Sequence, residues 1–128
     1  MYKIIACDLD ETLLSADTHV SVENREAIQK AVAHGVKFVP ATGRGYVSVQ
    51  NTLKEIGLEQ AANEYVISFN GASITENKNN RVLYFDGLPN EIADRLYRHG
   101  VELDIAMHVY TQDMVYTYHI DDDERAYM

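Results

Sequence analysis

The segment Tyr2–Leu14 constrains the fold more than any other part of the chain. A run of four apolar residues, Ile4–Cys7, ends at two carboxylates, Asp8 and Asp10. A short apolar run bounded by polar residues is typical of a strand buried on both faces, as in a parallel sheet. Because alternate side chains of an extended chain project to the same side, Asp8 and Asp10 are expected to converge just beyond the strand. In open α/β sheets, ligands bind beyond the carboxyl ends of the strands.

Two carboxylates that lie this close repel each other. At a separation of roughly 5 Å and an effective dielectric constant of about 20, the repulsion costs about 3 kcal/mol. Such a pair must share a proton or bind a cation, and oxygen ligands suit a hard divalent ion. The pair Asp8 and Asp10 therefore indicates a Mg²⁺ site; the alternative is a solvated, aspartate-rich turn after a strand.

The first 71 residues alternate between strand-like and helix-like patterns. Residues 21–34 and 46–56 have helical patterns, and residues 36–39 and 65–69 have the apolar pattern of buried strands. Together with the first strand, this order reads β-α-β-α-β. Such alternation predicts an α/β fold with a parallel sheet, right-handed crossovers and helices on the faces of the sheet.

The pattern changes near residue 72. Residues 72–75 and 81–85 flank a polar turn and predict a hairpin. A helix is expected from Pro89 to the pair His99–Gly100, followed by two strand-like segments that suit a half-exposed antiparallel sheet. Residues 86–128 also hold ten acidic but only three basic residues. These observations predict two domains, residues 1–71 and a more acidic α+β module of residues 72–128.

Composition excludes several classes of protein. The formal net charge of −9 argues against non-specific nucleic-acid binding, which needs basic patches. No apolar run is long enough to span a membrane, and the chain does not start like a signal peptide, so a cytoplasmic protein without a membrane partner is expected. Cys7 is the only cysteine. It is either a small buried residue of the strand, which its surroundings favour, or a reactive thiol beside Asp8.

Three motifs follow the three strands: DLDETLL after the first, ATGR after the second and NGA after the third. Together they resemble the haloacid dehalogenase-like superfamily, and most closely its Cof-type phosphatases. The resemblance implies a partial Rossmann-like parallel sheet over residues 1–71 and the start of an α+β cap over residues 72–128. It implies a Mg²⁺-dependent phosphatase that acts on a small phosphorylated metabolite, such as a sugar phosphate.

The resemblance also implies roles for the two aspartates. Asp8 is the expected nucleophile, which attacks phosphorus and forms an aspartyl-phosphate. Asp10 is the expected general acid and base, which protonates the leaving oxygen and then deprotonates water. Mg²⁺ is expected on the Asp8 carboxylate and on the backbone carbonyl of Asp10, where it neutralises their repulsion and phosphoryl charge.

The remaining expected site residues would bind the phosphate or the rest of the substrate. The Thr42 hydroxyl and the Gly43 amide match the second motif of the family, and Leu9 is assigned to phosphate binding with them. Arg44 is expected to bind a phosphate through its guanidinium, or else to be a surface arginine at a helix start. Asn70 is expected to bind substrate or to orient a neighbouring loop, or else to form a turn with the glycine that follows it.

Two elements of the family pattern are not found in this sequence. Related phosphatases carry a lysine on a later core strand and a further acidic pair that completes the Mg²⁺ site. Lys54 and Lys78 lie in the wrong contexts, and residues 121–123 follow an alternating strand and suit a solvated acidic turn. The chain therefore resembles the first part of such an enzyme, cut within its cap. Weak activity or none is expected, and the alternative is a non-catalytic remnant or a dimerising interaction module.

The missing strands also have a structural consequence. In this fold they would pair alongside the first strand, so the strand of residues 2–7 is expected to lie at the edge of the sheet. An apolar, unpaired edge is a template for another chain, and we expect self-association or low solubility.

Overall fold

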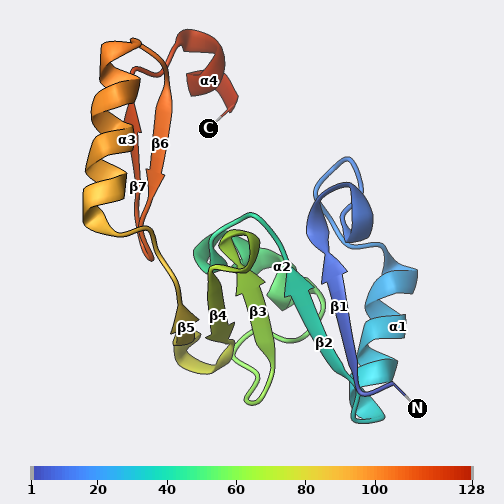
Figure 1. The fold of residues 1–128 in the computed structure, drawn as a ribbon. Coiled ribbons are helices and arrows are strands. Elements are labelled where there is room, and N and C mark those ends of the chain that lie inside the picture. Colours follow the sequence, from blue (N-terminus) through green and yellow to red (C-terminus); the bar gives the residue numbers. More distant parts are fainter. Residues whose placement is uncertain (1, 128) are drawn as a thin grey trace. The chain divides into compact units, whose positions relative to one another are not determined.

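The computed structural model describes residues 2–127 (Figure 1). These residues divide after Asp86 into two compact units, unit 1 before this point and unit 2 from Gly87 onward. Each unit has its own sheet. Unit 1 contains five strands and unit 2 contains two.

The sheet of unit 1 has the order β1-β2-β3-β4-β5. Strands β1, β2 and β3 are parallel, whereas β4 and β5 continue the sheet in antiparallel fashion (Figure 1). This arrangement confirms the predicted α/β fold class. The strand bounds are Ile4–Asp8 for β1, Lys37–Ala41 for β2, Tyr65–Ser68 for β3, Ser73–Glu76 for β4 and Arg81–Phe85 for β5.

The crossovers between the parallel strands contain the two predicted helices. Helix α1 (Val22–Ala33) starts at Ser21, whose hydroxyl accepts a hydrogen bond from the Asn24 amide at 3.2 Å. It ends before Gly35, which has a φ of +79° and so suits a helix C-terminus. The helix predicted over residues 46–56 is divided into a 3-10 turn, Tyr46–Val49, and a short helix α2, Gln50–Glu55.

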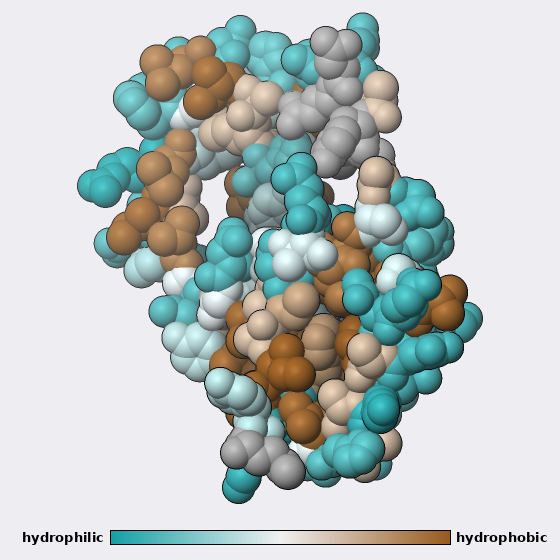
Figure 2. Space-filling model, turned by 90° about the vertical axis from the view of Figure 1, so that its right-hand side faces the viewer, coloured by the Kyte–Doolittle hydropathy of each residue, from teal (hydrophilic) through white to brown (hydrophobic). Residues whose placement is uncertain are grey.

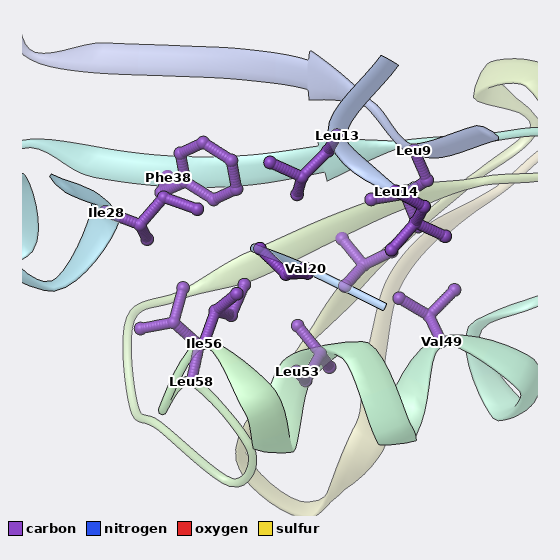
Figure 3. Close-up of a cluster of buried hydrophobic side chains, with 11 residues drawn as sticks. Leu9, Leu13, Leu14, Val20, Ile28, Phe38, Val49, Leu53, Ile56 and Leu58 are labelled. Carbon is purple, nitrogen blue, oxygen red and sulfur yellow. The ribbon is translucent and has the colours of Figure 1, made fainter. Parts of the chain in front are cut away.

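The hydrophobic core of unit 1 joins the parallel strands to these helices. Phe38 of β2 packs in one cluster with Ile28 of α1 and Leu53 of α2 (Figure 3). The turn after β1 contributes Leu9 and Leu13, of which Leu9 is completely buried. The buried side chains of Leu9 and Leu13 therefore hold the segment around the two aspartates against the core.

Strand β1 lies at the edge of the sheet, as expected, and is not buried on both faces. Its only paired neighbour among the described residues is β2, and Ile4 and Ile5 are 63% and 41% exposed. Figure 2 views the chain from the side of β1 and α1 in Figure 1 and shows hydrophobic surface exposed there. The apolar composition of β1 matches a central strand, whereas its position in this chain is peripheral.

The boundary between the units follows Asp86, not residue 71. The predicted hairpin forms, with the 3-10 turn Lys78–Asn80 between β4 and β5, but it extends the sheet of unit 1. Strands β3 and β4 pair in antiparallel register over four residue pairs, from Tyr65–Glu76 to Ser68–Ser73. The strands of this sheet change from parallel to antiparallel pairing after β3. The sequence pattern therefore changes near residue 72, before the boundary between the units at Asp86.

Unit 2 combines a helix with a two-stranded antiparallel sheet. Helix α3 (Asn90–Glu102) is followed by strands β6 (Met107–Tyr110) and β7 (Val115–Tyr118) and by a short helix α4 (Asp122–Tyr127). Pro89 occupies the N-cap of α3, close to the predicted start.

Helix α3 continues through Gly100, where the sequence predicted its end. A Cβ atom at Gly100 would lie 2.0 Å from the Met107 sulfur. The glycine thus allows β6 to pack closely against the helix, and it does not terminate the helix.

No helix within residues 2–127 is long and apolar enough to cross a bilayer.

Candidate active site

The carboxyl ends of the three parallel strands lie next to one another and define the candidate site. Asp8, the last residue of β1, is in register with Ala41 of β2, and Ala41 is in register with Ile67 of β3. The residues that follow these three positions carry the three sequence motifs. The parallel sheet therefore brings the motifs to one edge, as the sequence predicted.

A five-residue turn, Leu9–Leu13, follows β1 and carries Asp10, while Asp8 is the last residue of the strand. The Leu14 amide closes the turn on the Leu9 carbonyl at 2.8 Å, and Glu11 adopts a φ of +56°. Leu9 points into the core, while Asp8 and Asp10 are exposed. The Leu9 side chain therefore cannot contact phosphate, and its predicted role is restricted to the backbone.

Asp8 has a neutral hydrogen-bond partner. The Thr12 hydroxyl donates to Asp8 Oδ2 at 3.1 Å. Within residues 2–127 no basic side chain forms an ion pair with Asp8. A carboxylate in this position keeps its negative charge available to a cation or an electrophile. Thr12 was not among the predicted site residues. The alternation of Asp8, Asp10 and Thr12 in the sequence could have indicated that it belongs with them.

Asp10 instead has a cationic partner. Arg44 Nε donates to Asp10 Oδ2 at 3.0 Å, and Arg44 Nη2 donates to Asp10 Oδ1. This bidentate pair joins the turn after β1 to the loop after β2. Arg44 therefore belongs to the site, but its guanidinium is engaged by a carboxylate.

The loops after β2 and β3 are joined by three backbone hydrogen bonds. The Thr42 amide donates to the Ile67 carbonyl at 3.0 Å, the Phe69 amide to the Arg44 carbonyl at 3.1 Å, and the Asn70 amide to the Thr42 carbonyl at 3.1 Å. Thr42 is 5% exposed, and its hydroxyl accepts a hydrogen bond from the Arg44 amide at 3.1 Å. The loops thus hold the Thr42 hydroxyl in place with its own proton free to donate elsewhere.

Close packing explains two of the glycines in these loops. A Cβ atom at Gly43 would lie 3.0 Å from Asn70 Oδ1, and one at Gly45 would lie 2.8 Å from the Phe69 ring. Phe69 and Asn70 both have left-handed backbone conformations, with φ of +52° and +55°. This strained turn places the carboxamide side chain of Asn70 against Gly43. Asn70 therefore lies beside the predicted phosphate-binding loop.

The chemistry of the donors suits Mg²⁺, but the set is small. Among the described residues no group of three or more His, Cys, Asp or Glu side chains could hold a metal ion. Asp8 and Asp10 offer hard oxygen donors at an exposed position, where water can complete an octahedral shell.

The sequence also raised two further groups, the acidic residues 121–123 and the thiol of Cys7. Residues 121–123 belong to unit 2; Asp121 precedes α4 and is exposed, and the side chain of Asp123 lies outside the described part of the chain. Cys7 packs against the core of unit 1. Burial, together with the adjacent charge of Asp8, raises the pKa of the Cys7 thiol. This favours the interpretation of Cys7 as a structural residue, because a raised pKa leaves less thiolate.

A family model described as haloacid dehalogenase-like hydrolase matches residues 5–128. The chain therefore belongs to the haloacid dehalogenase-like hydrolases, and the resemblance inferred from the three motifs is confirmed.

Individual relatives agree with this assignment. YxeH of Bacillus subtilis (strain 168), provisionally named a phosphatase, is 38% identical over 117 residues, which cover 91% of this chain and 43% of YxeH. The HMP-PP phosphatase of Serratia proteamaculans (strain 568) is 29% identical over 113 residues, which cover 88% of this chain and 39% of that protein. A crystal structure of a haloacid dehalogenase-like hydrolase from Bacteroides thetaiotaomicron matches with a TM-score of 0.80 and 26% identity, over 91% of this chain and 44% of that chain. The chain thus spans less than half the length of these proteins.

Proposed function

We propose that this chain carries the nucleophile and the phosphate-binding loop of a Mg²⁺-dependent phosphomonoester hydrolase, which works through an aspartyl-phosphate on Asp8. The observation that carries the proposal is the placement of Asp8. It ends β1, in register with the residue before Thr42, and its hydrogen-bond partner is the neutral Thr12 hydroxyl. An ion pair with a basic side chain would occupy the Asp8 oxygens, which in this proposal attack phosphorus and bind Mg²⁺.

The two aspartates have complementary roles in this reaction. Asp8 forms a bond to phosphorus while the bond from phosphorus to the leaving oxygen breaks. Asp10 gives a proton to the leaving oxygen and then takes one from the water that attacks the aspartyl-phosphate. Asp10 is exposed at the same turn, which is the position such a role requires.

The phosphoryl oxygens would be held mainly by the loop after β2. The Thr42 hydroxyl and the amides of Gly43 and Leu9 are donors, and Arg44 adds positive charge. The side chain of Asn70 lies against Gly43, so it can contact the same group. These donors stabilise charge on the phosphoryl group as it is transferred.

Mg²⁺ would bind the Asp8 carboxylate and the Asp10 carbonyl oxygen and would neutralise phosphoryl charge. The exposed oxygen donors at the end of β1 support this assignment.

The proposed substrate is a small phosphorylated metabolite of the cytoplasm, such as a sugar phosphate. The names of the relatives support phosphate ester chemistry. The sugar phosphate is the narrower part of the proposal. Its selection would depend on parts of the cap of which this chain carries only a portion.

As a chain of 128 residues, the protein is expected to be a weak catalyst or an inactive one. The lysine and the second acidic pair expected from the family pattern are not found in the sequence. Loss of a single charge-stabilising group typically costs about 10² to 10³ in rate. The alternative function is a non-catalytic remnant or a dimerising interaction module, which the exposed edge of β1 favours.

The test measures hydrolysis of p-nitrophenyl phosphate by the full chain, with and without Mg²⁺, beside an Asp8→Asn variant. We expect a slow, Mg²⁺-dependent rate that the variant lacks. Equal rates for the two proteins would remove the catalytic claim.

A second measurement distinguishes a chain that binds Mg²⁺ and phosphate without catalysis from a chain that does not bind them. Mg²⁺ with beryllofluoride, which mimics a phosphoryl group on aspartate, should raise the melting temperature of the wild-type chain, because a ligand of the folded state stabilises it. Asp8→Asn should not respond. A wild-type chain that also does not respond would favour the alternative function.

A further inference from the structure

The ion pair of Asp10 and Arg44 uses the edge of the guanidinium that is best suited to bind a phosphoryl group. Arg44 presents Nε and Nη2 together to both oxygens of Asp10. This is the bidentate geometry that arginine uses for carboxylates and phosphates alike. The Asp10 carboxylate and an incoming oxyanion are therefore alternative partners for one set of donors.

The main chain of Arg44 is fixed, so only its side chain can change partners. Its amide donates to Thr42 Oγ1, and its carbonyl accepts from the Phe69 amide. The guanidinium starts from a residue adjacent to Gly43 and two residues from Thr42, the groups proposed to hold the phosphoryl oxygens. Rotation of the side chain alone can thus transfer the donors from Asp10 to an oxyanion in this loop.

The pair is also exposed enough to exchange partners readily. The side chains of Arg44 and Asp10 are 34% and 51% exposed. Partly exposed ion pairs contribute little to stability, so a doubly charged phosphoryl group can compete with a single carboxylate. A fully buried pair would not be exchanged so easily.

We propose that a phosphoryl group bound at this loop displaces Asp10 from Arg44. This inference rests on the proposed function, because it concerns the same site. Displacement gives the phosphate its bidentate partner and releases the Asp10 side chain to turn toward the leaving oxygen. Arg44 is then a positioning residue for Asp10 as well as a ligand of the phosphate, and the two roles exclude each other.

Competition between Asp10 and phosphate predicts the direction in which a substitution of Asp10 changes phosphate affinity. If Asp10 competes for Arg44, removal of the Asp10 charge should strengthen phosphate binding, and it should do so only while Arg44 is present. We expect Asp10→Asn to lower the dissociation constant for inorganic phosphate about three- to fivefold, the size of an exposed ion pair.

The experiment is a double-mutant cycle on the full chain, with inorganic phosphate as the probe and without Mg²⁺. It measures phosphate affinity for the wild type, Asp10→Asn, Arg44→Gln and the double variant. We expect Arg44→Gln to weaken binding and Asp10→Asn to have no effect in the Arg44→Gln background. Tightening by Asp10→Asn in both backgrounds, or no phosphate binding by any of the proteins, would overturn the proposal.

Glu11→Gln is the matched control for general electrostatics. Glu11 is the adjacent exposed carboxylate and is not a partner of Arg44. If Glu11→Gln strengthens phosphate binding as much as Asp10→Asn does, the effect is one of net charge, and the exchange of partners is rejected.

A spectroscopic readout tests the exchange without reference to catalysis. During a phosphate titration, the Arg44 Nε–H resonance and the Asp10 carboxyl ¹³C resonance should shift with one common midpoint. An Arg44 shift without a change at Asp10 would contradict the exchange. Failure of the Asp8→Asn comparison above would remove the catalytic proposal alone, since it does not involve this pair.

Discussion

At the scale of single residues, the two aspartates differ in their partners. Asp8 accepts a hydrogen bond from a neutral hydroxyl, whereas Asp10 is paired with a guanidinium. The pattern D-x-D predicted that both carboxylates would lie beyond β1, but it contains no information about their partners. Those partners come from residues 12 and 44, one local and one distant in the sequence. This difference in environment is compatible with the separate roles proposed for the two aspartates.

A first prediction concerns the contact between the loops after β2 and β3. Gly45→Ala should destabilise unit 1 by about 1 to 3 kcal/mol, because the added Cβ would lie 2.8 Å from the rigid Phe69 ring. Gly45 has a φ of −72°, which alanine tolerates, so the cost comes from packing alone. Urea denaturation monitored by circular dichroism measures the change.

The reference for this prediction is Phe69→Leu, which removes the ring. Gly45→Ala should cost less in the Phe69→Leu background than in the wild type, with a coupling energy of at least about 0.5 kcal/mol. Additive effects of the two substitutions would show that the ring is not the obstacle.

At the scale of elements, the segment that follows the aspartate turn is tied to α2 by one side chain. Glu55 of α2 accepts hydrogen bonds from His19 Nδ1 at 2.6 Å and from the Val20 amide at 2.9 Å. An isolated antiparallel bridge between Leu14 and Val20 closes this segment on itself. Glu55 therefore joins the polypeptide after the aspartates to α2, the helix that follows the proposed phosphate-binding loop.

This tie should depend on pH. The hydrogen bond to Glu55 and the charge of Glu55 raise the pKa of His19, while the Val20 amide and His19 lower the pKa of Glu55. The stabilisation from His19 is complete below its ordinary pKa of 6.5 and is lost as the pH rises through the raised value. The stabilisation from Glu55 is complete above its ordinary pKa of 4.5 and is lost as the pH falls through the lowered value.

The second prediction is therefore that the tie is strongest between about pH 4.5 and pH 6.5. The protection factor of the Val20 amide in hydrogen exchange should fall as the pH is raised from about 6 to about 8. Glu55→Gln keeps an acceptor for the amide but loses the charge, and it should remove this dependence. A wild-type protection factor that stays constant over this range would refute the prediction.

At the scale of the whole molecule, unit 1 has an open edge where its sheet begins. Strand β1 is apolar and pairs only with β2 among the described residues. Its other side presents backbone donors and acceptors that another strand can use.

The third prediction is that a second copy of the chain pairs with this edge. The weight-average mass in sedimentation equilibrium should rise with concentration. Ile4→Lys should keep the protein monomeric, because a charge on an edge strand opposes pairing. Ile4 is 63% exposed, so the substitution should leave the fold intact.

A substitution of the same kind away from the edge is the control. Val22 is exposed at the start of α1, and Val22→Lys should associate as the wild type does. A wild-type chain that remains monomeric at high concentration would contradict the proposed pairing. If Ile4→Lys and Val22→Lys reduce self-association equally, the association depends on exposed hydrophobic surface in general and not on the edge of β1.

The sequence by itself determined the order of the elements in unit 1 and the position of its site. Apolar periodicity and capping residues such as Ser21 and Gly35 are local signals, and parallel pairing then brings the ends of β1, β2 and β3 together. The motifs DLDETLL, ATGR and NGA follow these three strands and carried the resemblance to the family. The resemblance, in turn, assigned Thr42 and Gly43 to phosphate binding.

Only the tertiary structure decided which partners these residues have and where the units divide. The pairing of Arg44 with Asp10, the packing of Phe69 on Gly45, and that of Met107 on Gly100 join residues that no local pattern relates. The hairpin β4–β5 likewise joined the first sheet because ladder hydrogen bonds to β3 were available to it. Contacts of this kind depend on the position of a whole strand or loop in space, and a sequence window records only the conformation of its own residues.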